Sequence, residues 1–214
     1  MTWPTDAKAI FFDLDGTLAD SLDVMKMVYR RFLESLGKEP SDAEFARLNG
    51  PPLREIAGIL KRTHNLVDEE DQLLSKYQSI LDRVYEEVEP AAGALELLQH
   101  AKALGLTTAV VTSNGRRRTE SWLKRVGLSE TIDDVVTSED VTKGKPDPEP
   151  YMVALERARL LSTQALAVED SPSGARAARA AGLYTFALQI EAAENWPDGV
   201  HKIADLKSIK ALLA

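Results

Sequence analysis

Short, continuously apolar runs recur along the chain, and most of them end in polar side chains. They cover residues 9–12, 107–111, 134–137, 165–168 and 184–188. Runs of this length without alternation are typical of strands buried on both faces of a sheet. Segments with helical spacing lie between the later runs, and several of them end at a glycine, as helices often do. These segments are 93–104, 116–126, 148–160 and 173–181. The alternation predicts an α/β fold with a Rossmann-like parallel sheet core and helices on both faces.

One stretch interrupts the alternation, because only helical patterns occur between residues 19 and 88. The patterns cover 21–36, 52–60 and 68–87, and the sequence Ser41-Asp42-Ala43-Glu44 predicts a capping box at the start of a further helix. An insert of roughly 70 residues has the size of a small domain. The sequence therefore predicts an all-helical cap domain of residues 19–88, inserted into a catalytic core made of 1–18 and 89–214.

Polar side chains follow three of the predicted strands at the point where each strand ends. They are Asp13, Thr112 and Asp170. Ligands of open parallel sheets bind beyond the carboxyl ends of the strands. We therefore expect these three residues to meet at one edge of the sheet.

The strongest chemical signal is the sequence Asp13-Leu14-Asp15-Gly16-Thr17 directly after the first strand. Two carboxylates at the end of a buried strand are costly unless a cation pairs with them, and Mg²⁺ prefers such oxygen ligands. With its charge screened, Asp13 is a candidate nucleophile toward phosphorus, and Asp15 is a candidate general acid and base. The alternative is an ordinary Asp-Gly turn.

Further candidates for binding phosphate and metal lie near the ends of the later strands. Lys145, between glycine and proline residues, is a candidate for holding a phosphate oxygen, although a lysine in such a loop is usually just solvated. Thr112, with Ser113 and Asn114 at the start of the next helix, is expected to bind phosphate, or Thr112 simply ends a strand. Asp170 is a candidate metal ligand. Glu169 is a candidate ligand through a water molecule, or a group that supports the ligands without binding the metal. The same segment also fits a helix start at Ser171.

Composition narrows the class of protein. The chain has 214 residues, 44% of them hydrophobic, with a formal net charge of −8 and no cysteine. An acidic protein is poorly suited to bind nucleic acid, and the absence of cysteine excludes disulfides and thiolate sites. No segment resembles a signal peptide or a membrane span. We expect a cytoplasmic monomer or homodimer whose partner is a small phosphorylated metabolite.

Together these motifs resemble the haloacid dehalogenase superfamily of phosphohydrolases, in the branch with a helical cap inserted after the first motif. The resemblance extends over nearly the whole chain and implies a phosphatase that acts through an aspartyl-phosphate on Asp13. It also implies that Asp13, the backbone carbonyl of Asp15 and Asp170 bind Mg²⁺, and that Thr112 and Lys145 hold the phosphoryl group. The second aspartate argues against dehalogenation, because the dehalogenases lack it.

Within this branch, the sequence resembles both phosphoglycolate phosphatases and beta-phosphoglucomutases, so both activities stay open. The mutases carry a histidine in the first cap helix, where this chain has Met25, which favours a phosphatase. A non-enzymatic phosphate-binding protein is a more remote alternative. Arg54, Thr17 and Arg116 are candidates for contacts with the substrate, although an exposed arginine at the start of a helix is the ordinary alternative for both arginines.

Overall fold

The computed structural model describes residues 6–48, 51–188 and 195–213. Their strands form one parallel sheet in the order β3-β2-β1-β4-β5-β6. The strands are β1 (Ala9–Phe12), β2 (Thr107–Val111), β3 (Asp134–Val136), β4 (Ala165–Glu169), β5 (Tyr184–Leu188) and β6 (His201–Ile203). The predicted parallel sheet is confirmed. Residues 1–5, 49–50, 189–194 and 214 lie outside the described ranges. The structure therefore does not test the expectation about a signal peptide at residues 1–5.

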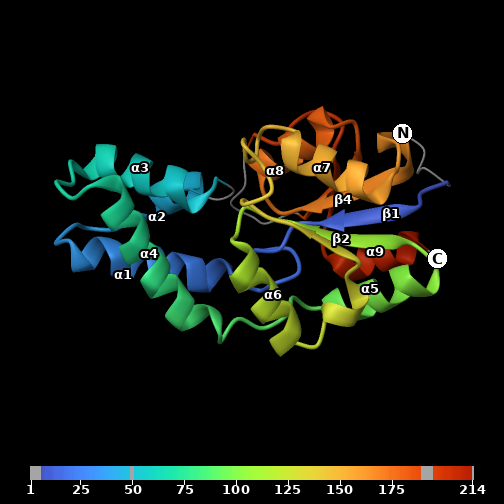
Figure 1. The fold of residues 1–214 in the computed structure, drawn as a ribbon, viewed down its shortest axis with the longest axis horizontal. Coiled ribbons are helices and arrows are strands. Elements are labelled where there is room, and N and C mark those ends of the chain that lie inside the picture. Colours follow the sequence, from blue (N-terminus) through green and yellow to red (C-terminus); the bar gives the residue numbers. More distant parts are fainter. Residues whose placement is uncertain (1–5, 49–50, 189–194, 214) are drawn as a thin grey trace.

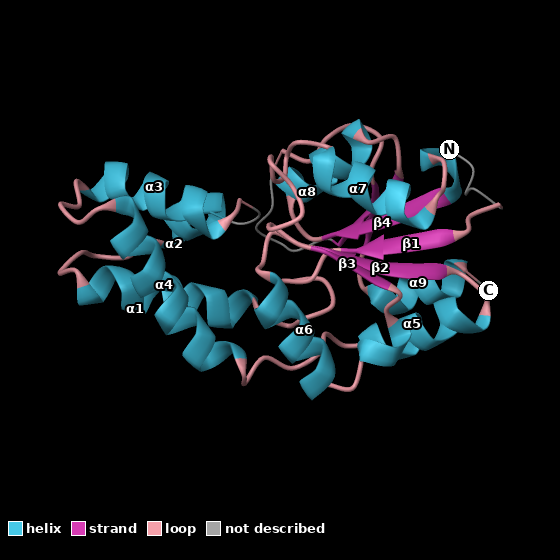
Figure 2. Ribbon diagram, viewed as in Figure 1, coloured by secondary structure: helices cyan, strands magenta, loops and turns pink. Residues whose placement is uncertain are grey.

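Alternate residues of a strand point to opposite faces of the sheet. Ile10 and Phe12 of β1 belong to one apolar cluster, and Ala9 and Phe11 to another. The first cluster packs against α5 (Ala94–Ala103), α6 (Arg116–Arg125) and α9 (Leu206–Leu212). The second packs against α7 (Glu149–Ala158) and α8 (Pro172–Ala180). Helices therefore cover both faces of the sheet (Figure 2). Two short 3₁₀ turns, Ser129–Thr131 and Ser162–Gln164, lead into β3 and β4.

The segment between β1 and α5 is helical and lies beside the sheet rather than on one of its faces (Figure 1). It contains α1 (Leu22–Ser35), α2 (Asp42–Phe45), the 3₁₀ turn Ala46–Leu48, α3 (Leu53–His64) and α4 (Glu70–Tyr85). Helix α4 packs against both α1 and α3, so these helices bury one another. None of the helices in the described residues has both the length and the apolar content that crossing a membrane requires.

The predicted capping box at the start of α2 is wrong. The side chain of Ser41 makes no capping hydrogen bond, because Glu44 turns into the helical layer instead. Its carboxylate accepts a hydrogen bond from the Tyr29 hydroxyl at 2.5 Å and lies 2.9 Å from Nε2 of His64. Burial and the Glu44 carboxylate together raise the pKa of Tyr29 to about 12. Glu44 thus links α1, α2 and α3, and the capping box of this region is found at Glu69 and Gln72 of α4 instead.

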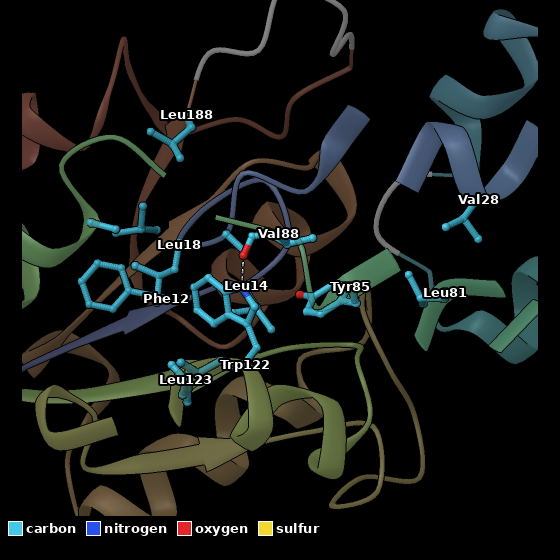
Figure 3. Close-up of a cluster of buried hydrophobic side chains, with 14 of the residues drawn as sticks. Phe12, Leu14, Leu18, Val28, Leu81, Tyr85, Val88, Trp122, Leu123 and Leu188 are labelled. Carbon is cyan, nitrogen blue, oxygen red and sulfur yellow. Dashed lines mark hydrogen bonds between the residues drawn. The ribbon is translucent and has the colours of Figure 1, made fainter. Parts of the chain in front are cut away.

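The chain crosses between the sheet and the helical segment twice, and backbone hydrogen bonds join the two crossing segments to each other. The backbone N–H of Asp20 donates to the carbonyl of Glu89 at 2.9 Å, and that of Ala91 donates to Leu18 at 2.8 Å. One residue before Glu89, the carbonyl of Val88 accepts a hydrogen bond from the Trp122 indole at 2.8 Å (Figure 3). We therefore propose the bounds 19–88 for the cap, and use this name for the segment below.

Candidate active site

The end of β1 is folded so that Asp13 stands at the sheet edge. Its backbone N–H continues the pairing with β4 by donating to the Val168 carbonyl at 2.9 Å, and its side chain is buried. The chain then turns sharply at Gly16, whose φ is 82°. A Cβ at this position would lie 2.2 Å from Oδ2 of Asp170. Glycine is therefore required here both by the backbone conformation and by the close approach of the Asp170 side chain.

Lys145 reaches this edge from the loop after β3 and is also buried. Its ammonium group donates hydrogen bonds to Oδ1 of Asp13 at 2.5 Å and to the Val111 carbonyl at 2.9 Å. The same group forms an ion pair with Oε1 of Glu169 at 2.6 Å. Although burial disfavours its charge, the two carboxylates hold the pKa of Lys145 above its usual range. Lys145 therefore stays protonated and fixes the direction of the Asp13 carboxylate.

Glu169 is the most enclosed of the acidic groups, with no exposed surface. Its carboxylate contacts Lys145 and accepts a hydrogen bond from the Tyr151 hydroxyl at 2.5 Å. Burial raises the pKa of Glu169 to about 7, against the opposing effect of Lys145. Ser171 caps α8 by accepting from the Gly174 N–H at 3.0 Å, as the sequence suggested. The contribution of Tyr151 has no local signal in the sequence.

The acidic side chains fit a divalent cation. Oxygen atoms of Asp13, Glu169 and Asp170 lie within 4.8 Å of one another, and all three residues are buried. Asp15 adds a fourth carboxylate, so the single ammonium group of Lys145 does not balance the charge of this cluster. Hard oxygen ligands of this kind suit Mg²⁺. Asp13 and Asp170 are the side chains here that would hold such an ion.

Both carboxylate oxygens of Asp15 accept hydrogen bonds. The Tyr85 hydroxyl, at the end of α4, donates to Oδ1 at 2.7 Å, and Nδ2 of Asn114 donates to Oδ2 at 3.2 Å. Burial and the charge of Asp13 raise the pKa of Asp15, while the hydrogen bond from Tyr85 and the charge of Arg118 oppose the rise. A carboxyl group with a raised pKa is suited to carry a proton for a leaving group.

The loop between β2 and α6 supplies the remaining predicted phosphate contacts. The hydroxyl of Thr112 accepts from the Asn114 N–H at 3.0 Å. Thr112 and Ser113 border both of the cavities described below, and Asn114 borders the smaller one. The structure therefore brings Asp13, Thr112 and Lys145 together. Ser113 and Asn114 lie at the same edge of the sheet.

Two cavities meet at this edge. The larger, of about 1270 Å³, lies between α3 and α4 of the cap and the loops of the core. Charged side chains of both signs line it. The smaller, of about 60 Å³, lies directly over the carboxylates, and the cap side chains around it are mainly apolar. These cap residues are Leu22, Met25, Phe45, Leu48, Pro51, Leu53, Ile56 and Tyr77.

Two of the candidate substrate contacts differ sharply in position. Arg54 borders the large cavity, but its side chain is 63% exposed and pairs with Asp71 at 2.8 Å. Thr17 is fully buried, and its hydroxyl finds no hydrogen-bond partner among the described residues. This placement argues against the expected substrate contact for Thr17.

Arg116 faces away from the cavities. Its guanidinium pairs with Asp140 at 2.6 Å and with Glu120 at 3.0 Å on the outer side of the core. Arg118, two residues along α6, borders the large cavity and pairs with Asp82 of the cap at 2.6 Å. The arginine run at the start of α6 does reach the site, but through Arg118 rather than through Arg116.

Comparison with known proteins agrees with this arrangement. Residues 10–188 match the model of the haloacid dehalogenase-like hydrolase family. The chain belongs to this family. The match begins in β1 and ends in β5, so it includes every strand end at which a candidate residue lies. The resemblance inferred from the motifs is confirmed, and the chain is an enzyme, a phosphoric monoester hydrolase of this family.

Two bacterial relatives and one solved structure illustrate the similarity. A phosphorylated carbohydrates phosphatase of Thermotoga maritima is 33% identical over 177 residues, which are 82% of each chain. A phosphoglycolate phosphatase of Nitrosospira multiformis is 33% identical over 196 residues, 88% of this chain and 86% of the relative. The crystal structure of beta-phosphoglucomutase from Clostridium difficile has a TM-score of 0.81 at 16% identity, covering 97% of both chains. At that identity the similarity shows the fold alone.

Proposed function

We propose that the protein is a Mg²⁺-dependent phosphatase that hydrolyses a small phosphorylated metabolite through an aspartyl-phosphate intermediate on Asp13. The observation that carries the proposal is the buried contact of Asp13 with Lys145 beside the acidic cluster of Glu169 and Asp170. A carboxylate held in one direction, beside acidic groups that could hold a cation, is what the proposed attack on a phosphoryl group requires.

In the first step, an Asp13 oxygen attacks phosphorus, and the bond from phosphorus to the leaving oxygen breaks. Asp15 gives its proton to that oxygen, so the product leaves as an alcohol. In the second step, Asp15 takes a proton from water, whose oxygen attacks phosphorus and releases Asp13 and inorganic phosphate. Thr112 and Lys145 would hold the non-reacting phosphoryl oxygens. Asp13, the Asp15 carbonyl and Asp170 would hold Mg²⁺, which would supply positive charge for the phosphate oxygens.

A beta-phosphoglucomutase-like activity is the second candidate, and two observations disfavour it. Met25 lies at the position of the mutase histidine and borders the cavity over the carboxylates. Its thioether has no proton to exchange with a sugar hydroxyl. The two named relatives at 33% identity are phosphatases. A non-enzymatic phosphate-binding role is disfavoured because both aspartates of the first motif are present.

For the substrate, we propose a phosphorylated carbohydrate or phosphoglycolate. The named relatives support these two classes, and the large cavity has space for a sugar. Its mixed lining of acidic and basic side chains suits hydroxyl groups better than a second phosphate.

A phosphate-release screen tests the proposal. We expect hydrolysis of p-nitrophenyl phosphate with Mg²⁺, none with EDTA, and inhibition by Ca²⁺, whose looser coordination lets Asp13 bind through both oxygens. Phosphoglycolate and hexose phosphates are then compared. Full activity in metal-free buffer would overturn the metal assignment. Conversion of β-glucose 1-phosphate to glucose 6-phosphate without release of phosphate would favour the mutase.

A further inference from the structure

The proton-carrying residue of the proposed reaction belongs to the core, yet one of its two hydrogen bonds comes from the cap. Tyr85 is the last residue of α4, and its hydroxyl lies 2.7 Å from Oδ1 of Asp15. The ring is buried, and it extends from its helix toward Leu14 and Trp122 of the core (Figure 3). A hydroxyl that bonds one carboxylate oxygen limits rotation of the carboxylate about its last bond.

The second oxygen of Asp15 is held by a chain of contacts that begins at the same end of α4. Nδ2 of Asn114 donates to this oxygen at 3.2 Å, and the amide oxygen of Asn114 accepts from Arg118. Arg118 in turn donates from Nε and from its terminal nitrogen to Asp82 of the cap, at 3.0 and 2.6 Å. Because Arg118 occupies the amide oxygen, the amide nitrogen of Asn114 is the end that faces Asp15.

The two routes form one unit, because they start at the same end of α4 and contact each other on the way to Asp15. Asp82 and Tyr85 are three residues apart on α4, which places them on the same side of the helix. The guanidinium carbon of Arg118 lies 5.8 Å from the centroid of the Tyr85 ring. The side chain of Arg118 is only 11% exposed. A movement of this end of α4 would therefore release both oxygens of Asp15 together.

We propose that Tyr85 is a positioning residue for Asp15, through which the cap aims the proton donor at the leaving group. The Asp82–Arg118–Asn114 chain has the same task for the second oxygen. The inference rests on the proposed function, since it assigns Asp15 the proton transfer. Misplacing a reacting group by about 1 Å is enough to cost ~10²-fold in rate.

A purely structural role for Tyr85 predicts something different. Its ring packs in the apolar cluster that includes Leu14 and Trp122. Losing that packing would lower stability and would slow all substrates alike. Tyr85→Phe keeps the ring and removes only the hydroxyl group, so it separates packing from positioning.

The test compares p-nitrophenyl phosphate with phenyl phosphate, which have similar rings but leaving groups of different basicity. The readout is kcat/KM, which reports steps up to the first irreversible one and so excludes hydrolysis of the phosphoenzyme. For Tyr85→Phe we expect a fall of roughly 10- to 100-fold with phenyl phosphate, within the range of general acid catalysis. With p-nitrophenyl phosphate, which leaves with little help, we expect a fall of less than about threefold.

Tyr29→Phe is the matched control, because it removes a hydroxyl group from a buried cap tyrosine that bonds Glu44 instead of Asp15. It should lower the melting temperature and affect both substrates equally. Asp82→Asn gives a second measurement at a more exposed position, with 36% of the side chain exposed. It should also lower kcat/KM for phenyl phosphate more than for p-nitrophenyl phosphate, but by a smaller factor than Tyr85→Phe does, since Tyr85 remains in place.

The results separate this inference from the proposed function. Equal losses on both substrates in Tyr85→Phe, or no loss on either, would overturn the positioning role. If Tyr85→Phe does not fold, an equal effect of Asp82→Asn on both substrates would overturn it as well. If the wild-type enzyme releases no phosphate from either compound, the phosphatase assignment fails instead.

Discussion

The two sides of the active site are built on different principles. On the core side, buried charged groups touch one another: Lys145 contacts Asp13 and Glu169 at 2.5 and 2.6 Å. On the cap side, the surface over the carboxylates is mainly apolar, and the charged residues stand farther out. The exception is Tyr85, a cap residue that bonds directly to Asp15.

This contrast separates chemistry from recognition. Strands fixed by hydrogen bonds on both sides hold side chains precisely, as nucleophilic attack and proton transfer require. The cap reaches the core through two paired crossings at Asp20–Glu89 and Leu18–Ala91, so its helices face the site without being part of the sheet. Changes on the core side should therefore affect every substrate, and changes on the cap side should depend on the substrate.

The largest effects are expected for the two aspartates of the core. Asp13→Asn removes the nucleophile, so activity should fall at least about 10⁴-fold. No labelled phosphoenzyme should form with any substrate in rapid-quench samples. Asp20→Asn, an exposed position in the same segment, serves as the control and should be active. A labelled phosphoenzyme in Asp13→Asn would break the assignment of the core side.

Asp15→Asn should fail in a different way. It keeps the nucleophile, so p-nitrophenyl phosphate should still phosphorylate Asp13, while turnover drops by about 10²–10⁴-fold. The signature is a burst of nitrophenolate near one equivalent per site, followed by slow release. With an alkyl phosphate the first step itself should nearly stop, because an alkoxide needs the proton. A variant with neither burst nor phosphoenzyme would contradict the division of labour between the two aspartates.

Much of the core side could be predicted from the sequence for a geometric reason. Parallel strands end at a common edge, so a polar residue after each apolar run predicts a shared site without any knowledge of contacts. This reasoning located Asp13, Thr112 and Asp170. It did not find β6, whose three residues carry too weak a pattern, or α9 that follows it.

The cap contributions could not be predicted in the same way. Tyr85 and Asp15 are 70 residues apart in sequence, and nothing near either residue marks the contact. The rotation of α6 about its axis decides that Arg118 and not Arg116 faces the site, and tertiary packing fixes that rotation. At Ser41 the local capping signal was outweighed by the contacts of Glu44 with Tyr29 and His64.

Lys145→Met tests how strongly the core side depends on buried charge. It leaves Asp13 and Glu169 without their cation, which should lower the free energy of unfolding by about 3–5 kcal/mol. Because Mg²⁺ binds the folded state and supplies positive charge at the same point, it should raise the melting temperature of the variant more than that of the wild type. Lys143→Met, with 72% of the side chain exposed, is the control. Equal shifts with Mg²⁺ in variant and wild type would argue against a shared electrostatic cluster.

Glu44→Gln applies the same test to a buried carboxylate of the cap. The Tyr29 hydroxyl, whose pKa is raised to about 12, is protonated at neutral pH like any tyrosine and needs an acceptor. Weakening its bond and that of His64 should cost roughly 1–3 kcal/mol of stability. The loss should be independent of Mg²⁺, and denaturant unfolding with and without the metal measures it. Glu34→Gln, at an exposed position of α1, should show no loss.

The smallest effect is expected for Arg54→Ala, at the rim of the large cavity. A buried charged contact with the substrate would be worth about 1.5–3 kcal/mol. Arg54 is instead 63% exposed and already pairs with Asp71, which is 79% exposed. Ion pairs between exposed side chains contribute at most ~1 kcal/mol, and we expect a contact between the exposed Arg54 and the substrate to be equally weak. KM for the natural substrate should therefore rise no more than about fivefold, and KM for p-nitrophenyl phosphate should not change. Asp71→Ala is the informative partner variant, because it frees Arg54 and should lower KM if the arginine contacts substrate. An equal rise for both substrates in Arg54→Ala would mean that Arg54 recognises nothing beyond the phosphoryl group.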